Sequence, residues 1–111
     1  MWDIQLFKLN FDNQEREAVT NVIDSGWLTM GERTLEFESA FSRFHGDNIS
    51  CLAVANCTAA LHMALLALDI KKDDEVIIPA LTFVADINVV KMVGAKAVLA
   101  DSSSLDDWNV S

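Results

Sequence analysis

The sequence predicts an α/β fold in which parallel strands alternate with helices. Residues 51–55 form a short, nearly continuous apolar run that is typical of a strand buried on both faces, and the runs at residues 75–78 and 96–100 are the second and third predicted strands. Between these runs, residues 58–68 and 82–92 have helical patterns, and only short turns separate the segments. Strand, helix, strand, helix, strand in this order predicts two βαβ units with parallel strands and right-handed crossovers.

Two amphipathic helices are expected ahead of this alternation. Asp12 and Glu15 have the spacing of a capping box, and apolar residues then recur on one face up to Gly26. A second apolar stripe predicts a helix over about residues 33–45, which Gly46 ends. A loop at residues 27–31 joins the two helices.

Composition excludes several classes of protein. The chain has 111 residues, enough for one small domain, and a net charge of −9. Such an acidic surface is repelled by nucleic acids and by anionic membranes, so neither is expected as a partner. No apolar run approaches the roughly 20 residues that span a bilayer, and the N-terminus does not have the pattern of a signal peptide. Cys51 and Cys57 form no disulfide framework and lack zinc-ligand spacing, which favours a cytoplasmic location.

Candidate binding residues lie just beyond the carboxyl ends of the predicted strands, where ligands bind in open parallel sheets. A strand gives way to a helix within residues 56–59, so free backbone N–H groups and the Thr58 hydroxyl could hold an anion such as phosphate. The alternative is that Thr58 only caps a buried helix. Phe83 could stack on a planar ring or pack in the core, and Asp101 is the only carboxylate at a strand's carboxyl end.

Other reactive side chains favour structural roles. Cys57 lies near a helix N-terminus, but a catalytic cysteine needs a base, and the spacing to His45 or His62 forces no contact. His62 lies among leucines on a predicted core helix. The acidic run at residues 73–75 predicts a solvated turn, so no metal site is expected.

Four stretches in order resemble the DegT/DnrJ/EryC1/StrS family of sugar aminotransferases, which use pyridoxal 5'-phosphate (PLP). The stretches are GWLTMG at 26–31 with LEFE at 35–38, AVANCTAALHMAL at 53–65, DEVIIPALTFVA at 74–85 and VGAKAVLAD at 93–101. The resemblance covers about residues 6–110. It implies that residues 1–111 are an incomplete N-terminal portion of the large, PLP-binding domain of an aspartate-aminotransferase-type fold. Residues 1–49 would then form a helical arm, 50–101 a βαβαβ core and 102–111 a tail.

The resemblance also implies roles for single residues. Thr58 and Ala59, together with Cys57, would hold the cofactor phosphate through the hydroxyl group and backbone N–H groups. Phe83 would stack on the pyridine ring. Thr29 and Gly31 would lie near the active site and reach the substrate. The family often has glycine at the position of Cys57. This departure bears on whether the backbone at position 57 still reaches the phosphate.

The full enzyme that the resemblance implies is a cytoplasmic homodimer that moves an amino group from an amino acid, glutamate, to a keto-sugar nucleotide. In this family the Schiff-base lysine and the aspartate that pairs with the pyridinium nitrogen lie downstream, and Lys91 and Lys96 do not match the lysine's setting. No catalytic residue is therefore expected within 1–111, and the chain alone is expected to be inactive. Two alternatives remain open: a PLP-dependent sugar dehydratase, which has histidine in place of that lysine, and a non-catalytic, truncated half-domain.

Overall fold

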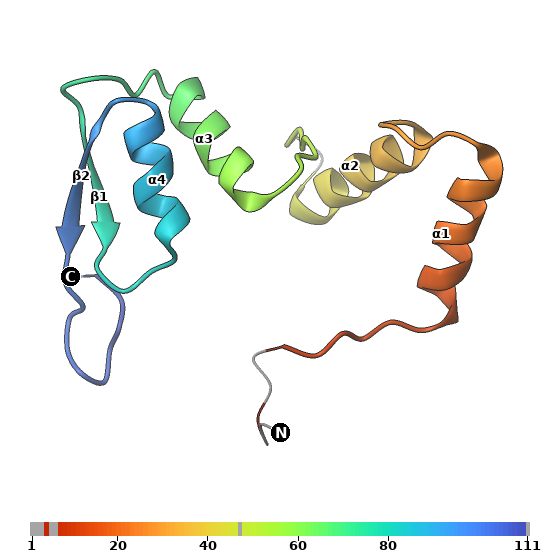
Figure 1. The fold of residues 1–111 in the computed structure, drawn as a ribbon, viewed down its shortest axis with the longest axis horizontal. Helices are drawn as coiled ribbons and strands as arrows, with labels where there is room; N and C mark the ends of the chain where they lie inside the picture. Colours follow the sequence, from red (N-terminus) through yellow and green to blue (C-terminus); the bar gives the residue numbers. More distant parts are fainter. Residues whose placement is uncertain (1–3, 5–6, 47, 111) are drawn as a thin grey trace. The chain divides into compact units, whose positions relative to one another are not determined.

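The computed structural model describes residue 4 and residues 7–46 and 48–110 of the chain (Figure 1). The chain divides into two compact units, Met1–Ala53 and Val54–Ser111. Among the described residues the elements run in the order α1, α2, α3, β1, α4, β2. This confirms the predicted α/β class.

The first unit contains α1 (Asn13–Ser25) and α2 (Glu32–His45). The predicted capping box is present: the Gln14 N–H donates to Asp12 Oδ1 at 2.7 Å, and the Asp12 N–H donates to Glu15 Oε2 at 2.8 Å. Gly26 ends α1 in the left-handed conformation, with φ at 70°. Both predicted helices are therefore confirmed, and their ends follow from residues visible in the sequence.

The second unit contains α3 (Cys57–Ala67), β1 (Glu75–Pro79), α4 (Val84–Met92) and β2 (Lys96–Ala100). The two strands are parallel, with Ile77 opposite Val98, and α4 connects them. A bond from the Ala80 N–H to the Ala100 carbonyl, 2.8 Å long, continues the ladder beyond β1.

A small core holds this unit together. Ile78 of β1, Val90 of α4 and Ala95 before β2 are at most 8% exposed and pack together. The helix α4 is well buried, whereas no residue of α3 is buried. The expectation that α3 is largely buried is wrong, because α3 packs on α4 and no other described element covers its remaining faces.

One further expectation differs from the structure. Residues 51–55 do not form a strand: no described strand lies beside their backbone, and Leu52 is 65% exposed. No described helix or strand follows β2, as expected, and the segment there is a closed loop in which Ser102 and Val110 form an isolated antiparallel bridge. No described helix has both the length and the apolar character needed to cross a membrane.

Candidate functional site

The N-terminus of α3 presents two unpaired backbone donors. Asn56 caps the helix: its Oδ1 accepts the Ala59 N–H at 2.9 Å, and its carbonyl oxygen accepts the Ala60 N–H at 3.2 Å. The N–H groups of Cys57 and Thr58 have no acceptor among the described residues. These two groups, with the Thr58 hydroxyl, form the donor set that an anion meets at the positive end of the helix dipole.

Asn56 was not singled out as a site residue from the sequence. The signal was present, since an asparagine directly before a helical pattern is a preferred N-cap. Its effect is to satisfy the Ala59 N–H, which the family resemblance assigns to the phosphate. In this structure the donors offered to a ligand are therefore those of the two preceding residues, Cys57 and Thr58.

Phe83 lies at the same end of the second unit as the start of α3. Figure 1 shows that α3 and α4 both begin at the end where β1 and β2 finish. Phe83 directly precedes α4, and its side chain is 74% exposed, so the described residues do not bury it. The alternative that Phe83 packs in the core is not supported. The Thr82 hydroxyl donates to the Asp86 carboxylate and fixes the first turn of α4 beside the ring.

Asp101 follows β2 at this same end, and its Oδ1 accepts the Ser102 N–H at 2.8 Å. The lysines of the second unit lie elsewhere. Lys91 is in the last turn of α4, and Lys96 opens β2, where its Nζ is 2.6 Å from Glu75 Oε1. The hydrogen bond from Lys96 to Glu75, together with the charge of Glu75, raises the pKa of Lys96 above its usual value of 10.5. Neither lysine is placed to react with a ligand at the N-terminus of α3.

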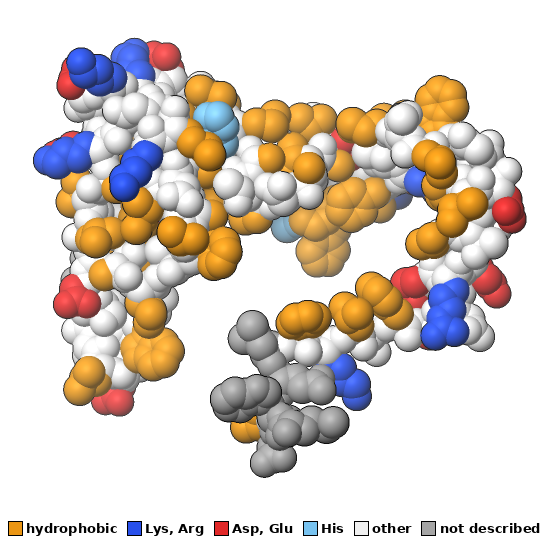
Figure 2. Space-filling model, viewed as in Figure 1, with side chains coloured by type: hydrophobic (Ala, Val, Ile, Leu, Met, Phe, Trp, Pro, Cys, Tyr) orange, Lys and Arg blue, Asp and Glu red, His pale blue; other side chains and the backbone are white. Residues whose placement is uncertain are grey.

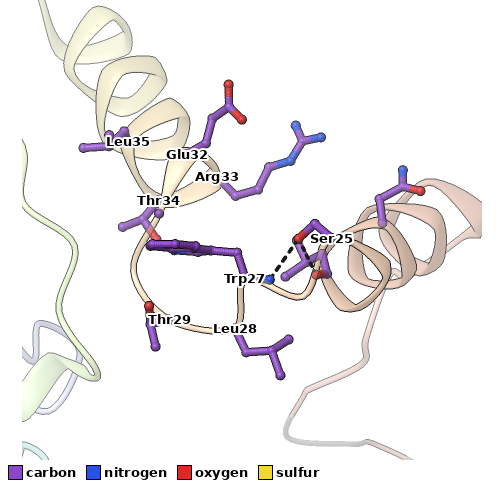
Figure 3. Close-up of a pocket in the computed structure, with 11 residues that line it drawn as sticks. Ser25, Trp27, Leu28, Thr29, Glu32, Arg33, Thr34 and Leu35 are labelled. Atoms are coloured by element: carbon purple, nitrogen blue, oxygen red, sulfur yellow. Dashed lines mark hydrogen bonds between the residues drawn. The ribbon is translucent and has the colours of Figure 1, made fainter.

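The first unit holds a separate pocket of about 620 Å³ at the turn between α1 and α2 (Figure 3). The loop residues Trp27, Leu28, Thr29 and Gly31 line it, together with residues of both helices. The predicted substrate residues Thr29 and Gly31 are thus brought to one pocket within this unit. The predicted cofactor residues Cys57, Thr58, Ala59 and Phe83 belong to the second unit, and all six assignments remain predictions.

Comparisons with known proteins give a consistent result. The sequence profile of the DegT/DnrJ/EryC1/StrS aminotransferase family matches residues 10–111. A protein of Streptococcus pneumoniae described as a sugar aminotransferase, Spr1654, is 30% identical over 98% of this chain, with a TM-score of 0.86. It has been solved in PLP, PMP and apo forms.

Two other solved structures are similar to the chain. An aminotransferase from Psychrobacter cryohalolentis is 37% identical over 85% of the chain, with a TM-score of 0.76. A GDP-4-keto-6-deoxymannose-3-dehydratase is 24% identical over 98% of it, with a TM-score of 0.87, and this likeness shows the fold alone. The chain spans only 27%, 24% and 29% of the lengths of these three proteins, respectively.

Proposed function

Because the chain belongs to the DegT/DnrJ/EryC1/StrS aminotransferase family, we propose that it forms the N-terminal part of a PLP-dependent enzyme. This enzyme transfers the amino group of glutamate to a keto-sugar nucleotide. The observation that supports the proposal is the pair of unpaired N–H groups at the start of α3, at the same end of the unit as the exposed Phe83 ring.

The residues present fit two parts of PLP. Its phosphate is an anion, and the Cys57 and Thr58 N–H groups with the Thr58 hydroxyl are donors at a helix N-terminus. Its pyridine ring is flat and aromatic, and the open face of Phe83 suits stacking. When bound, PLP supplies the electron sink that amino transfer requires. The role of residues 57–83 is therefore to bind and orient the cofactor.

The chemistry of the reaction needs two further groups, an amine that bonds to the cofactor and a carboxylate that pairs with its ring nitrogen. Lys91 and Lys96 lie away from the N-terminus of α3, as described above. We place both groups in a further part of the enzyme, beyond residue 111. On this account residues 1–111 alone do not transaminate, and the active enzyme is a cytoplasmic homodimer in which Thr29 and Gly31 reach the substrate.

A PLP-dependent sugar dehydratase is the second candidate. The fold of the chain matches that of GDP-4-keto-6-deoxymannose-3-dehydratase with a TM-score of 0.87. The same cofactor-binding segment serves both reactions in this account. The residue that takes the place of the cofactor-bonding lysine decides between them, as the resemblance implies.

The test is to purify the complete protein with PLP and add L-glutamate and a keto-sugar nucleotide. The account predicts that glutamate converts bound PLP to its amino form, which changes the visible absorbance, and that an amino sugar appears in the mass spectrum. Loss of water from the sugar, without amination, would favour the dehydratase. A complete protein that binds no PLP would refute both candidates, and transamination by residues 1–111 alone would refute the proposed division of the site.

A further inference from the structure

Trp27 folds back over the loop that joins α1 to α2. Its indole Nε1–H donates to the Met30 carbonyl oxygen at 3.1 Å. Its backbone N–H donates to Ser25 Oγ at 3.2 Å, and the Ser25 hydroxyl in turn donates to the Val22 carbonyl at 2.7 Å. The residue is therefore tied to the end of α1 by its backbone and to the far side of the loop by its ring.

Gly31 lies directly against this ring. A Cβ added to Gly31 would clash with both Cδ1 and Nε1 of Trp27, far inside ordinary carbon–carbon contact of about 3.5–4.0 Å. The backbone of Gly31 is extended, with φ at −157°, which any residue adopts. A side chain at position 31 would therefore meet the Trp27 ring, and one of the two would have to shift, whereas the backbone conformation places no such limit.

The same contact ties the loop to α2. Gly31 is the N-cap of α2, and its carbonyl oxygen accepts the N–H groups of Thr34 at 3.0 Å and Leu35 at 3.1 Å. Residues 28–30 are therefore held between two helix ends by one aromatic ring. Figure 3 shows Thr29 on this loop with its side chain directed away from α2.

We propose that Trp27 is a positioning residue whose ring closes the loop and fixes Thr29 for contact with the sugar substrate. Together, the contacts of Trp27 with Met30 and Gly31 form the Trp27 lock. The proposal rests on the proposed function, which assigns Thr29 and Gly31 to the substrate. A loop that is ordered before binding does not lose conformational entropy on binding, so the lock lowers KM for the sugar more than it changes kcat.

The test uses the complete protein with PLP, L-glutamate and two probes, GDP-4-keto-6-deoxymannose and its UDP-linked 4-keto-6-deoxyglucose counterpart. For the probe that the unmodified enzyme turns over, Trp27→Ala and Gly31→Ala should each raise KM about tenfold, as expected for about 1.4 kcal/mol of lost ordering, with little change in kcat. Trp27→Phe keeps a ring but loses the N–H, so its KM should be intermediate.

Trp108 offers a matched control. It is 68% exposed against 63% for Trp27, and its indole Nε1–H also donates to a carbonyl three residues away, that of Leu105, at 2.8 Å. Trp108→Phe should leave KM unchanged. Because Gly31→Ala acts on the loop through the ring, it should raise KM less once Trp27 is alanine than it does in the unmodified enzyme.

A second readout does not depend on activity. In the ¹H–¹⁵N spectrum of the complete protein, Gly31→Ala should shift the indole N–H signal of Trp27 and leave that of Trp108 in place. An unmoved Trp27 signal, independent effects of the two alanine variants, or an unchanged KM in an active Trp27→Ala enzyme would each overturn the proposal. A complete protein that binds no PLP refutes the proposed function, and the role of the lock in substrate binding falls with it.

Discussion

At the scale of single residues, the Asn56 side chain decides which backbone donors remain for a ligand. It occupies the Ala59 N–H and leaves those of Cys57 and Thr58. The sequence predicted the donor site at Thr58 because a strand-like run gives way there to a helix. It did not predict that Ala59 is bonded, because this depends on the side-chain conformation of Asn56, which residue spacing does not determine.

Replacing Thr58 with valine keeps the size of the side chain and removes its hydroxyl. The affinity of the complete protein for PLP should fall about ten- to hundredfold, since a hydrogen bond to a charged group contributes about 1.5–3 kcal/mol. Absorbance titration with PLP measures this. Thr20→Val is the control, because the exposed Thr20 hydroxyl donates only to the Arg16 carbonyl of its own helix. Equal affinities of the Thr58→Val variant and the unmodified protein would contradict the phosphate role.

Replacing Phe83 with leucine tests the stacking role. The side chain is 74% exposed, so folding should change little, while PLP binding weakens about two- to tenfold through loss of an aromatic pair. The same titration measures the effect. Phe44→Leu, at an 83% exposed position of α2, should bind PLP normally. A Phe83→Leu protein that binds PLP normally would show that the ring does not stack on the cofactor.

At the scale of elements, the sequence predicted helices better than strands. The ends of α1 follow from Asp12, Glu15 and Gly26, all of which act within a few residues of the chain. A strand instead needs a partner that bonds along its edge. The parallel pair β1 and β2 has one, whereas residues 51–55 have none among the described residues, so their apolar run gave a wrong prediction.

The packing of α4 on the sheet is tested at Val90, which is 2% exposed and contacts the core of Ile78 and Ala95. Val90→Ala should lower the opening free energy of the β1–β2 ladder by about 2 kcal/mol, because it leaves a cavity. Amide hydrogen exchange of the chain 1–111 measures this. Val84→Ala, at a 58% exposed position of the same helix, should have little effect. Equal effects at the two positions would contradict the proposed packing.

The stability of the β1–β2 ladder should depend on pH. Glu75 and Lys96 are opposite in the register, and the raised pKa of Lys96 means that the folded chain favours its charged form. The pair should therefore stabilise the ladder at neutral pH and lose this effect as pH rises through the raised pKa of Lys96. Near pH 7, the amide hydrogens of the ladder should exchange faster in the Lys96→Met variant than in the unmodified chain.

The difference between Lys96→Met and the unmodified chain should disappear in alkaline solution above the pKa of Lys96. Global unfolding of both proteins against pH extends the comparison beyond the range in which amide exchange is measurable. Lys91→Met is the control, since Lys91 forms no ion pair among the described residues. A difference between Lys96→Met and the unmodified chain that persists above that pKa would contradict the assignment.

At the scale of the whole molecule, most apolar side chains lie at the surface of the two units (Figure 2). In the described part of the chain only a few residues are buried: Ile78, Ala85, Val89, Val90 and Ala95. Hydrophobic periodicity predicted the helices α2 and α3, but it does not indicate what covers their apolar side chains. This is why helix positions were predictable and the burial of α3 was not.

The family was predictable at this scale only from the order of motifs. The resemblance over about residues 6–110 is confirmed by the family match over residues 10–111. The net charge and the composition argued against nucleic acids and anionic membranes as partners, but they indicated no reaction. Neither the sequence pattern nor the fold of these units specifies the sugar on which the proposed enzyme would act.

We propose that residues 1–111 supply the cofactor-binding half of a site that further polypeptide completes. Reading the coding DNA past the codon for Ser111 tests this proposal. We expect an open frame that continues and encodes an aspartate and then a lysine in the family's sequence context. A histidine in place of that lysine would move the assignment to sugar dehydration, and a stop codon directly after Ser111 would contradict the catalytic claim.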